Sequence, residues 1–170
     1  MQQNFIGISE NRLHHILGVA RKAYKIAKDM GFEEDFCRRC FMLGWIHDVG
    51  YEFAENQSEH PYISAKMLLL INEDTVASDL KKPFYKAIKE HGRYPSGMTE
   101  EHSEIKITEE YRILNMADMQ VDSQGNEVSV SQRLDDIKNR YGEHSDQYLT
   151  ACDICYLIGL TAVNFAANIT

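Results

Sequence analysis

Four histidines and two aspartates are the residues of this chain whose types and positions could do chemistry. The most informative two are adjacent, His47 and Asp48, within the stretch FMLGWIHDVGYEF. A carboxylate in apolar surroundings is costly unless something pairs with it, and a metal ion does this best. Imidazole and carboxylate also form the ligand mixture that zinc, iron and manganese accept. Because a lone His-Asp pair is commonly a chance neighbour on a surface, a metal site requires further ligands aimed at the same point.

Helical spacing selects those further candidates. His15 flanks an apolar helical face, whereas its neighbour His14 falls on the face typical of solvent exposure. His91 closes an apolar stripe, and Asp118 interrupts one, where an unpaired carboxylate is rare. His60 stands at a predicted helix start, where it could equally be a ligand or a polar cap. Taken singly, His15 is more typical of a satisfied core histidine than of a ligand.

The elements that must position these residues are all helices. Apolar residues recur at spacings of three and four throughout, and we find no convincing strand pattern. The predicted helices run from Ser9 to about Met30, Glu34 to His47, His60 to Asn72, Ser78 to Glu90 or His91, Thr108 to Val121, Ser129 to Tyr141, and Ser145 to Ala167. A short polar loop is expected at Tyr51–Glu59. The last helix is apolar around most of its circumference, which is typical of a core or dimer helix.

The fold class that follows is all-α: a single-domain bundle of about seven helices over residues 1–170. The motif-bearing core spans about residues 9–122, and residues 129–168 form the C-terminal helices. A helical bundle builds a metal site from side chains on separate helices that project into its core. His15, His47, Asp48, His60, His91 and Asp118 are therefore the predicted inward-pointing set.

Charge and hydropathy exclude several classes of function. The formal net charge of −8 argues against nucleic acid as a partner, because phosphate backbones are bound by clustered Lys and Arg. It does not exclude a small nucleotide. Met1–Ser9 lacks the pattern of a signal peptide, and the longest apolar tract, Ile154–Ala167, is shorter than the ~20 residues that span a bilayer. We expect a soluble, cytoplasmic protein without a membrane partner, in which the last helix leaves a homodimer open.

The four cysteines form two C-x-x-C pairs, Cys37/Cys40 and Cys152/Cys155. This spacing occurs in zinc ribbons and redox pairs. Here both pairs lie within helical patterns and lack flanking Gly-rich turns. We favour small buried residues at helical i, i+3 spacing, and a structural zinc protein remains an alternative class.

The order H…HD…D, in RLHHILGVA, GWIHDVGYEF and RILNMADMQ, resembles the HD-domain superfamily of metal-dependent phosphohydrolases. The resemblance covers His15 to Asp118. Two further histidines, in EHPYISAKMLL and AIKEHGRYPSG, resemble those of its dinuclear branches, most closely the bacterial symmetrical diadenosine-tetraphosphate hydrolases. The resemblance implies one metal held by His15, His47, Asp48 and Asp118, and a second held mostly by His60 and His91, with Asp48 bridging.

The function that this resemblance implies is hydrolysis of a nucleotide, or of a related small phosphate ester or anhydride, by a metal-activated water. The cofactors would be divalent ions, two of them, of the Fe, Mn or Zn type. Asp48 would be the catalytic residue that positions the water, and Arg93 would contact a phosphate oxygen. His14 or Tyr51 could assist the leaving group. A non-catalytic domain that senses a nucleotide in the same pocket is the alternative.

The chain departs from the family pattern at two places. Many relatives carry Lys after H-D-x-G, where this chain has Tyr51. The segment MQVDSQGNEV, which follows Asp118, lacks the Glu-Pro and Arg expected in the diadenosine branch. Both departures concern the substrate rather than the metal ligands.

Overall fold

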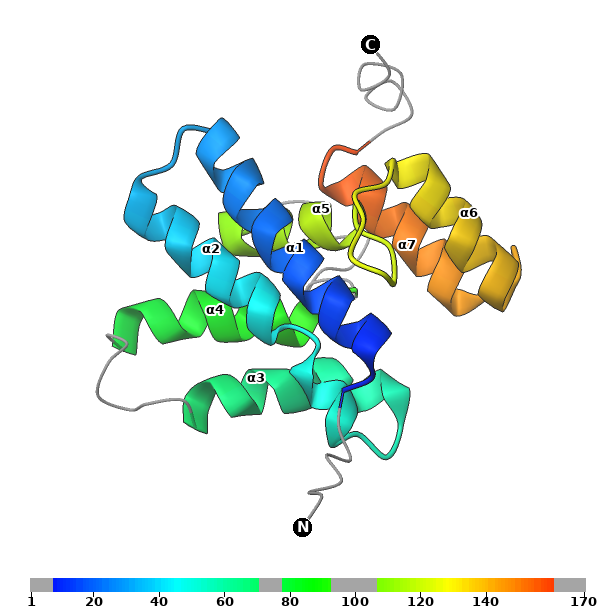
Figure 1. Cartoon of the computed structure of the whole chain (residues 1–170), viewed down its shortest axis with the longest axis horizontal. Coiled ribbons are helices and arrows are strands. Elements are labelled where there is room, and N and C mark those ends of the chain that lie inside the picture. Colours follow the sequence, from blue (N-terminus) through cyan, green and yellow to red (C-terminus); the bar gives the residue numbers. More distant parts are fainter. Residues whose placement is uncertain (1–7, 71–77, 93–106, 161–170) are drawn as a thin grey trace, which may run out of the picture.

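The chain folds as a helical bundle (Figure 1). The computed structural model describes residues 8–70, 78–92 and 107–160, without the side chains of residues 57, 69, 70 and 78–82. Within these ranges it contains no strand, so the predicted all-α fold is confirmed. Its helices are α1 (Glu10–Asp29), α2 (Glu34–Ile46), α3 (His60–Leu70), α4 (Ser78–Glu90), α5 (Glu109–Asp118), α6 (Val130–Tyr141) and α7 (Asp146–Leu157), with the 3₁₀ turns η1 (Val49–Glu52) and η2 (Gln57–Glu59) between α2 and α3.

Most helices begin where their capping residues predict. The side chains of Ser9, Thr108, Ser129 and Ser145 each accept a hydrogen bond from a backbone N–H of the first turn that follows. The segment Tyr51–Glu59, expected to be a short polar loop, includes the end of η1 and the whole of η2.

The predicted end of the last helix, Ala167, is wrong. α7 ends at Leu157 because Gly159 adopts a φ of 82°, which a glycine reaches without the strain other residues incur. Its N–H donates to Tyr156 O (3.2 Å), and Leu160 N–H donates to Cys155 O (2.8 Å). This pair of bonds is a Schellman motif, which satisfies the last carbonyls of a helix and turns the chain away. Residues 161–170 lie outside the described ranges.

α5 also ends earlier than predicted, at Asp118 instead of Val121. The chain then turns sharply, because the Asp122 carboxylate accepts hydrogen bonds from the backbone N–H groups of Gln124 (2.8 Å) and Asn126 (2.9 Å). A single antiparallel bridge joins Val121 to Glu127 across this turn. Asp118 is therefore the last residue of its helix.

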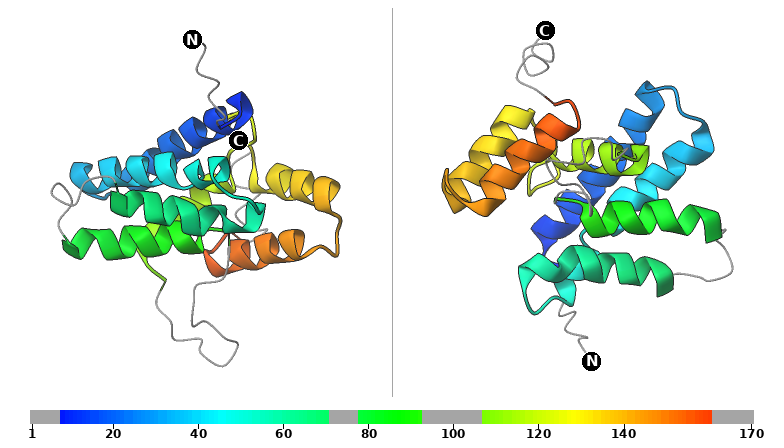
Figure 2. Two further views of the ribbon diagram at one scale, coloured as in Figure 1. Left: turned by 90° about the horizontal axis from the view of Figure 1, so that it is seen from below. Right: turned by 180° about the vertical axis from the view of Figure 1, so that it is seen from behind.

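The helices form three antiparallel pairs arranged around α5. α1 packs on α2, α3 packs on α4, and α5 contacts α1, α2 and α4. α6 and α7 pack against each other at one end of the molecule, as all three views show (Figures 1 and 2). The main core lies between the first five helices, and a smaller cluster of Met119, Val130, Ala151 and Cys155 joins the α6–α7 hairpin to the end of α5. None of the described helices is long and apolar enough to cross a membrane.

The cysteines belong to these cores. Cys37, Cys40 and Cys155 are buried, Cys152 is half-buried, and all four are free thiols. Among the described residues, no group of three potential metal ligands within reach of one another includes a cysteine. The structure thus gives no support to a structural zinc site, and the C-x-x-C pairs serve as small apolar packing residues.

The close approach of α1 and α2 depends on Gly44. A Cβ atom at this position would lie 2.6 Å from Ala20 Cα, a separation that real side chains do not tolerate. Since Gly44 also accepts a hydrogen bond from His47, this crossing fixes the end of α2 that leads into the His-Asp pair.

We predict that Gly44→Ala destabilises the protein by about 1–3 kcal/mol, the usual cost of overpacking. Alanine is intrinsically the better helix former by about 1 kcal/mol, so helix propensity alone predicts the opposite sign. Equilibrium denaturation in urea distinguishes the two. A variant as stable as the parent protein, or more stable, would contradict the close crossing.

Thiol reactivity provides a second test of the packing. Burial raises the pKa of Cys40 and of Cys155 to about 12, so neither thiol forms an appreciable thiolate at neutral pH. We expect an alkylating reagent to modify Cys152 first and the buried cysteines only on unfolding, with or without a chelator. Chelator-dependent labelling of all four would restore the structural zinc hypothesis.

Candidate metal centre

Six side chains from five parts of the chain meet at helix ends. His15 lies in the first half of α1, while the others stand at or just beyond a terminus: His47 and Asp48 after α2, His60 at the start of α3, His91 after α4, and Asp118 at the end of α5. Four of them are buried, and the side chains of His60 and Asp118 are 14% and 18% exposed. The structure therefore brings together every residue that the sequence predicts as a ligand.

Asp48 is the residue that these side chains share. Its Oδ1 lies 3.2 Å from Nε2 of His60 and 3.2 Å from Nε2 of His91. The same oxygen is 3.5 Å from His47 Nε2, and its Oδ2 is 3.7 Å from His15 Nε2. Two groups result, His15–His47–Asp48 and Asp48–His60–His91, and within each the potential ligand atoms lie within 4.8 Å of one another.

Asp118 stands beside the first group. Its Oδ1 lies 3.0 Å from His15 Nε2, but it does not share the mutual 4.8 Å reach of His15, His47 and Asp48. On its other side, Asp118 Oδ1 is 3.7 Å from Nη2 of Arg133. Its place as a ligand of the first metal stays a prediction.

Backbone carbonyls orient three of the imidazoles. Nδ1 of His15 is 2.9 Å from Asp122 O, Nδ1 of His47 is 2.6 Å from Gly44 O, and Nδ1 of His91 is 2.6 Å from Ile88 O. Because a carbonyl oxygen can only accept, each Nδ1 carries the proton. When these imidazoles are neutral, the lone pair is therefore on Nε2, the nitrogen that faces Asp48. Metal-binding histidines are typically oriented by a partner of this kind.

His47 carries the strongest indication of a cation. Its Nε2 is buried and makes no hydrogen bond among the described residues. Burial lowers the pKa of His47 to about 4, so the imidazole is neutral at physiological pH and its Nε2 lone pair is free. A buried polar atom left without a partner is costly, and a divalent ion would satisfy it. The donor set present thus fits a metal ion.

The electrostatics around Asp48 favour positive charge. Burial alone would raise the pKa of this carboxyl, but its electrostatic interaction with the His47 imidazole and hydrogen bonds with His60 and His91 hold it well below its usual range. Burial likewise opposes protonation of His15 and His91, yet the hydrogen bonds with Asp118 and Asp48 raise the pKa of each overall. The field that favours a proton on these nitrogens also favours a metal cation.

Gly50 allows the His-Asp segment to pack against the start of α3. A Cβ atom on Gly50 would lie 2.2 Å from His60 O, and its N–H donates to Ser64 Oγ (2.8 Å). Its φ is not in the left-handed region, so the turn predicted from Gly50 is explained by close packing. This contact keeps His60 next to Asp48.

A stack of three side chains closes one side of the site. The Tyr51 ring lies on the His60 imidazole, with 3.7 Å between ring centroids, and the guanidinium carbon of Arg12 is 3.9 Å from the Tyr51 centroid. Arg12 Nη1 also donates to Asp48 Oδ2 (2.5 Å). Burial raises the pKa of the Tyr51 hydroxyl, so it stays protonated.

His14 lies outside the site, whereas the structure does not describe Arg93. His14 is exposed and does not line the cavity, as its position on the solvent face predicts, so it is not placed to assist a leaving group. Arg93, the predicted phosphate contact, lies outside the described residues.

The sequence reasoning missed three residues of the site. Arg12 could have been found, because it precedes His15 by three residues and so shares its helix face. Asn115 precedes Asp118 by the same interval; it is buried, and its Oδ1 accepts from Gly92 N (2.9 Å) next to His91. Arg133 gives no local signal, since only tertiary packing brings α6 to the site.

The ligand groups open into a cavity of about 1080 Å³. His15, Asp48, His60, His91 and Asp118 line one part of it, together with Arg12 and Tyr51. Residues of α6 and α7 line another part, and residues near the start of α1, between η1 and α3, and around the end of α5 complete the lining. A volume of this size is at the upper end for small-molecule sites.

An all-α bundle that gathers a paired His-Asp and flanking histidines at its helix ends defines a class of helical domains with a metal-binding core. A family model, HD domain, matches residues 12–119, which is most of the chain. The protein therefore belongs to the HD domain family, which typically includes metal-dependent phosphohydrolases. No curated protein and no solved structure matches the chain in the corresponding comparisons.

Metal stoichiometry tests the two groups separately. We expect Asp48→Ala to abolish metal binding, because it removes the ligand that both groups share. His60→Gln or His91→Gln should lower the metal-to-protein ratio toward one while the first site stays filled.

His14→Gln, which alters the exposed neighbour of His15, is the matched control and should retain the parent ratio. The measurement is elemental analysis after equilibration with metal and desalting. Parent stoichiometry in the His60 and His91 variants would leave a single metal, and in Asp48→Ala would refute the assignment.

Proposed function

We propose that this protein is a metal-dependent phosphohydrolase that acts on a nucleotide or a related small phosphate ester or anhydride. The observation that carries the proposal is the pair of ligand groups that share the Asp48 carboxylate at the edge of a large cavity. A carboxylate with two usable oxygens can contact two cations, one through each group. The site fits divalent iron, manganese or zinc, whose ligands are imidazole and carboxylate.

Two bound cations would supply an activated water and neutralise charge on the phosphoryl oxygens. The chain's own contribution is to hold these ligands rigidly. His15, His47 and His91 are oriented by backbone carbonyls, and Tyr51 fixes the plane of His60. Asp48 is in the position to orient the attacking water, which is the catalytic role we propose for it.

Arg12 is the best-placed phosphate contact among the described residues. Its guanidinium lines the cavity, lies on the Tyr51 ring and pairs with Asp48. The planar guanidinium matches the oxygens of a phosphate. It could bind one when a cation neutralises the Asp48 carboxylate that now pairs with it. Arg93 remains a second proposed contact, based on sequence alone.

The substrate proposed is small. The net charge of −8 disfavours binding to a nucleic-acid backbone, whereas the cavity is large enough for a nucleotide. Diadenosine tetraphosphate is one candidate within this class, and its only support is the sequence resemblance of the two extra histidines. A cytoplasmic location and a homodimer likewise stay predictions.

The test is release of phosphate by the protein loaded with Mn²⁺, Fe²⁺ or Zn²⁺. Nucleoside monophosphates, diphosphates and dinucleoside polyphosphates should be compared side by side. We expect turnover of at least one class, its loss with a chelator and its restoration when metal is added back.

Variants connect this activity to the site. Asp48→Ala should abolish turnover, and Arg12→Gln should weaken kcat/KM by at least about tenfold, because a charge-assisted hydrogen bond contributes ~1.5–3 kcal/mol. Arg38→Gln is the control, since Arg38 is exposed on α2 and pairs only with Glu34 at 3.1 Å among the described residues. Tight nucleotide binding without turnover by the metal-loaded protein would favour the non-catalytic sensor.

A further inference from the structure

The α6–α7 hairpin lies beyond the part of the chain that matches the family model, yet it forms a wall of the cavity. The match ends at residue 119, whereas α6 begins at Val130. Residues of both helices line the cavity together with the predicted metal ligands. The hairpin is thus a feature of this chain that contributes to the site.

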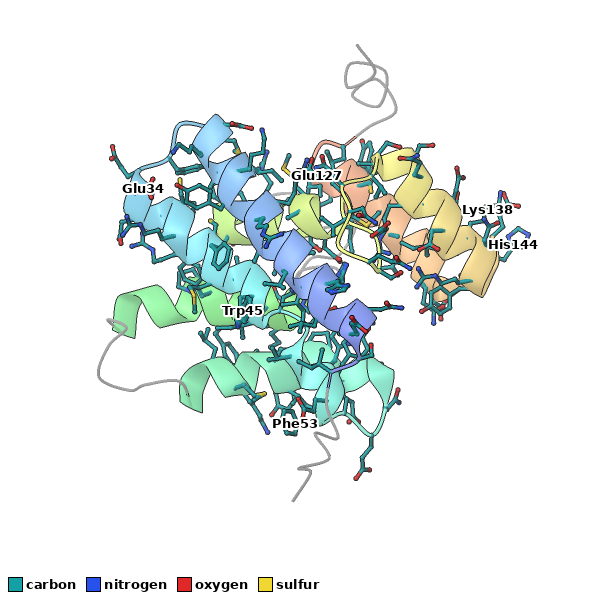
Figure 3. All side chains as sticks on the ribbon, in the orientation of Figure 1. Glu34, Trp45, Phe53, Glu127, Lys138 and His144 are labelled. Carbon is teal, nitrogen blue, oxygen red and sulfur yellow. The ribbon has the colours of Figure 1, made fainter. Side chains whose placement is uncertain are left out.

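One face of α6 is turned toward the cavity. The residues of α6 that line it are Arg133, Ile137, Arg140 and Tyr141. Their spacing of i, i+4, i+7 and i+8 places them on a single helical face. Lys138 and His144 lie at the outer end of the hairpin, away from α1 (Figure 3). The helix therefore presents two arginines to the cavity, separated by two turns, roughly 10 Å along the axis.

The two arginines have different surroundings. Arg133 is 14% exposed, its Nη2 is 3.7 Å from Asp118 Oδ1, and its buried Nε makes no hydrogen bond among the described residues. Its second ion pair, from Nη1 to Asp136 Oδ2, is 3.4 Å long. Arg140 is 45% exposed and forms a two-pronged pair with Asp136. Only Arg133 combines burial, an unused donor and proximity to a predicted metal ligand.

The turn before α6 fixes where Arg133 lies. Its Asp122 carbonyl accepts from His15 Nδ1 (2.9 Å), and its Glu127, labelled in Figure 3, pairs with Lys22 of α1 at 2.7 Å. Ser129 and Gln132 then form a reciprocal capping box that starts α6 at Val130, three residues before Arg133. The guanidinium is consequently held relative to the same histidine that contacts Asp118.

We propose that Arg133 is a substrate-binding residue that contacts a phosphoryl oxygen beside Asp118, and that the α6–α7 hairpin thereby completes the phosphate site. This inference rests on the proposed function. When a cation takes over the charge of Asp118, the guanidinium is free to bind an anion with its fork and its unused Nε–H. Arg133 therefore opposes cation binding and favours phosphate binding.

The opposite effects expected of Arg133 on cation binding and on phosphate binding can be measured separately. Orthophosphate is titrated by calorimetry into the Mn²⁺-loaded protein, and Mn²⁺ is titrated into the metal-free protein. Arg133→Gln should weaken orthophosphate binding by about tenfold, because a charge-assisted hydrogen bond is lost. The same variant should bind Mn²⁺ as tightly as the parent protein or more tightly. Arg133→Lys keeps the charge without the fork and should restore part of the phosphate affinity.

Arg140→Gln is the matched control, since Arg140 lies on the same helix face but two turns beyond Arg133, which is the arginine near Asp118. It should bind orthophosphate like the parent protein.

Parent-like phosphate affinity in Arg133→Gln would overturn the inference, as would an equal loss in Arg140→Gln. Loss of both Mn²⁺ and phosphate in Arg133→Gln would show a structural role instead. A parent protein that binds Mn²⁺ but no orthophosphate contradicts the inference alone, whereas one that binds no metal contradicts the proposed function and with it this inference.

Discussion

The buried carboxylate of Asp48 is the constraint on which the rest of the site depends. A charge removed from water requires compensation, and here it comes from imidazoles of four helices and the guanidinium of Arg12. His47, His60 and His91 come from the ends of three helices and Arg12 and His15 from α1, so four helices meet at this one charged group. One polar atom beside it is left over, since the buried Nε2 of His47 has no hydrogen-bond partner in the part of the chain that the structure describes. This is the feature that most directly indicates a cation.

Close backbone packing makes this convergence possible. Gly44 lets α2 approach α1, and Gly50 lets the segment after Asp48 rest on the start of α3. Neither position tolerates a Cβ atom, although neither requires a left-handed backbone. These glycines therefore allow the backbones to approach closely enough for the ligands to meet, while hydrogen bonds to backbone carbonyls set the orientation of the imidazoles.

The sequence predicted the helices, and helical periodicity, which reports the buried face of a helix, identified the inward-pointing side chains other than His60. His60 stood at a helix start, where periodicity left its role open. Asp118 was identifiable as a polar interruption of an apolar stripe, and His91 as the end of another. The sequence could not predict the end of α7, where Gly159 competes with an apolar pattern that continues beyond it. It also could not reveal Arg133 or the carbonyl partners of the imidazoles, because these depend on tertiary contacts between segments distant in the chain. The division of the predicted ligands into two groups, with Asp118 beside the first, likewise depends on tertiary contacts that the sequence does not show.

The hydrogen bond from His15 to the Asp122 carbonyl has a consequence for how this domain can be divided. The segment that matches the family model includes His15 but ends before Asp122. A fragment cut at that boundary would keep all six predicted ligands, yet the imidazole of His15 would lose the acceptor that selects its tautomer. In this chain the segment that matches the family model is therefore smaller than the structural unit that orients the predicted ligands, which extends at least to the turn at Asp122.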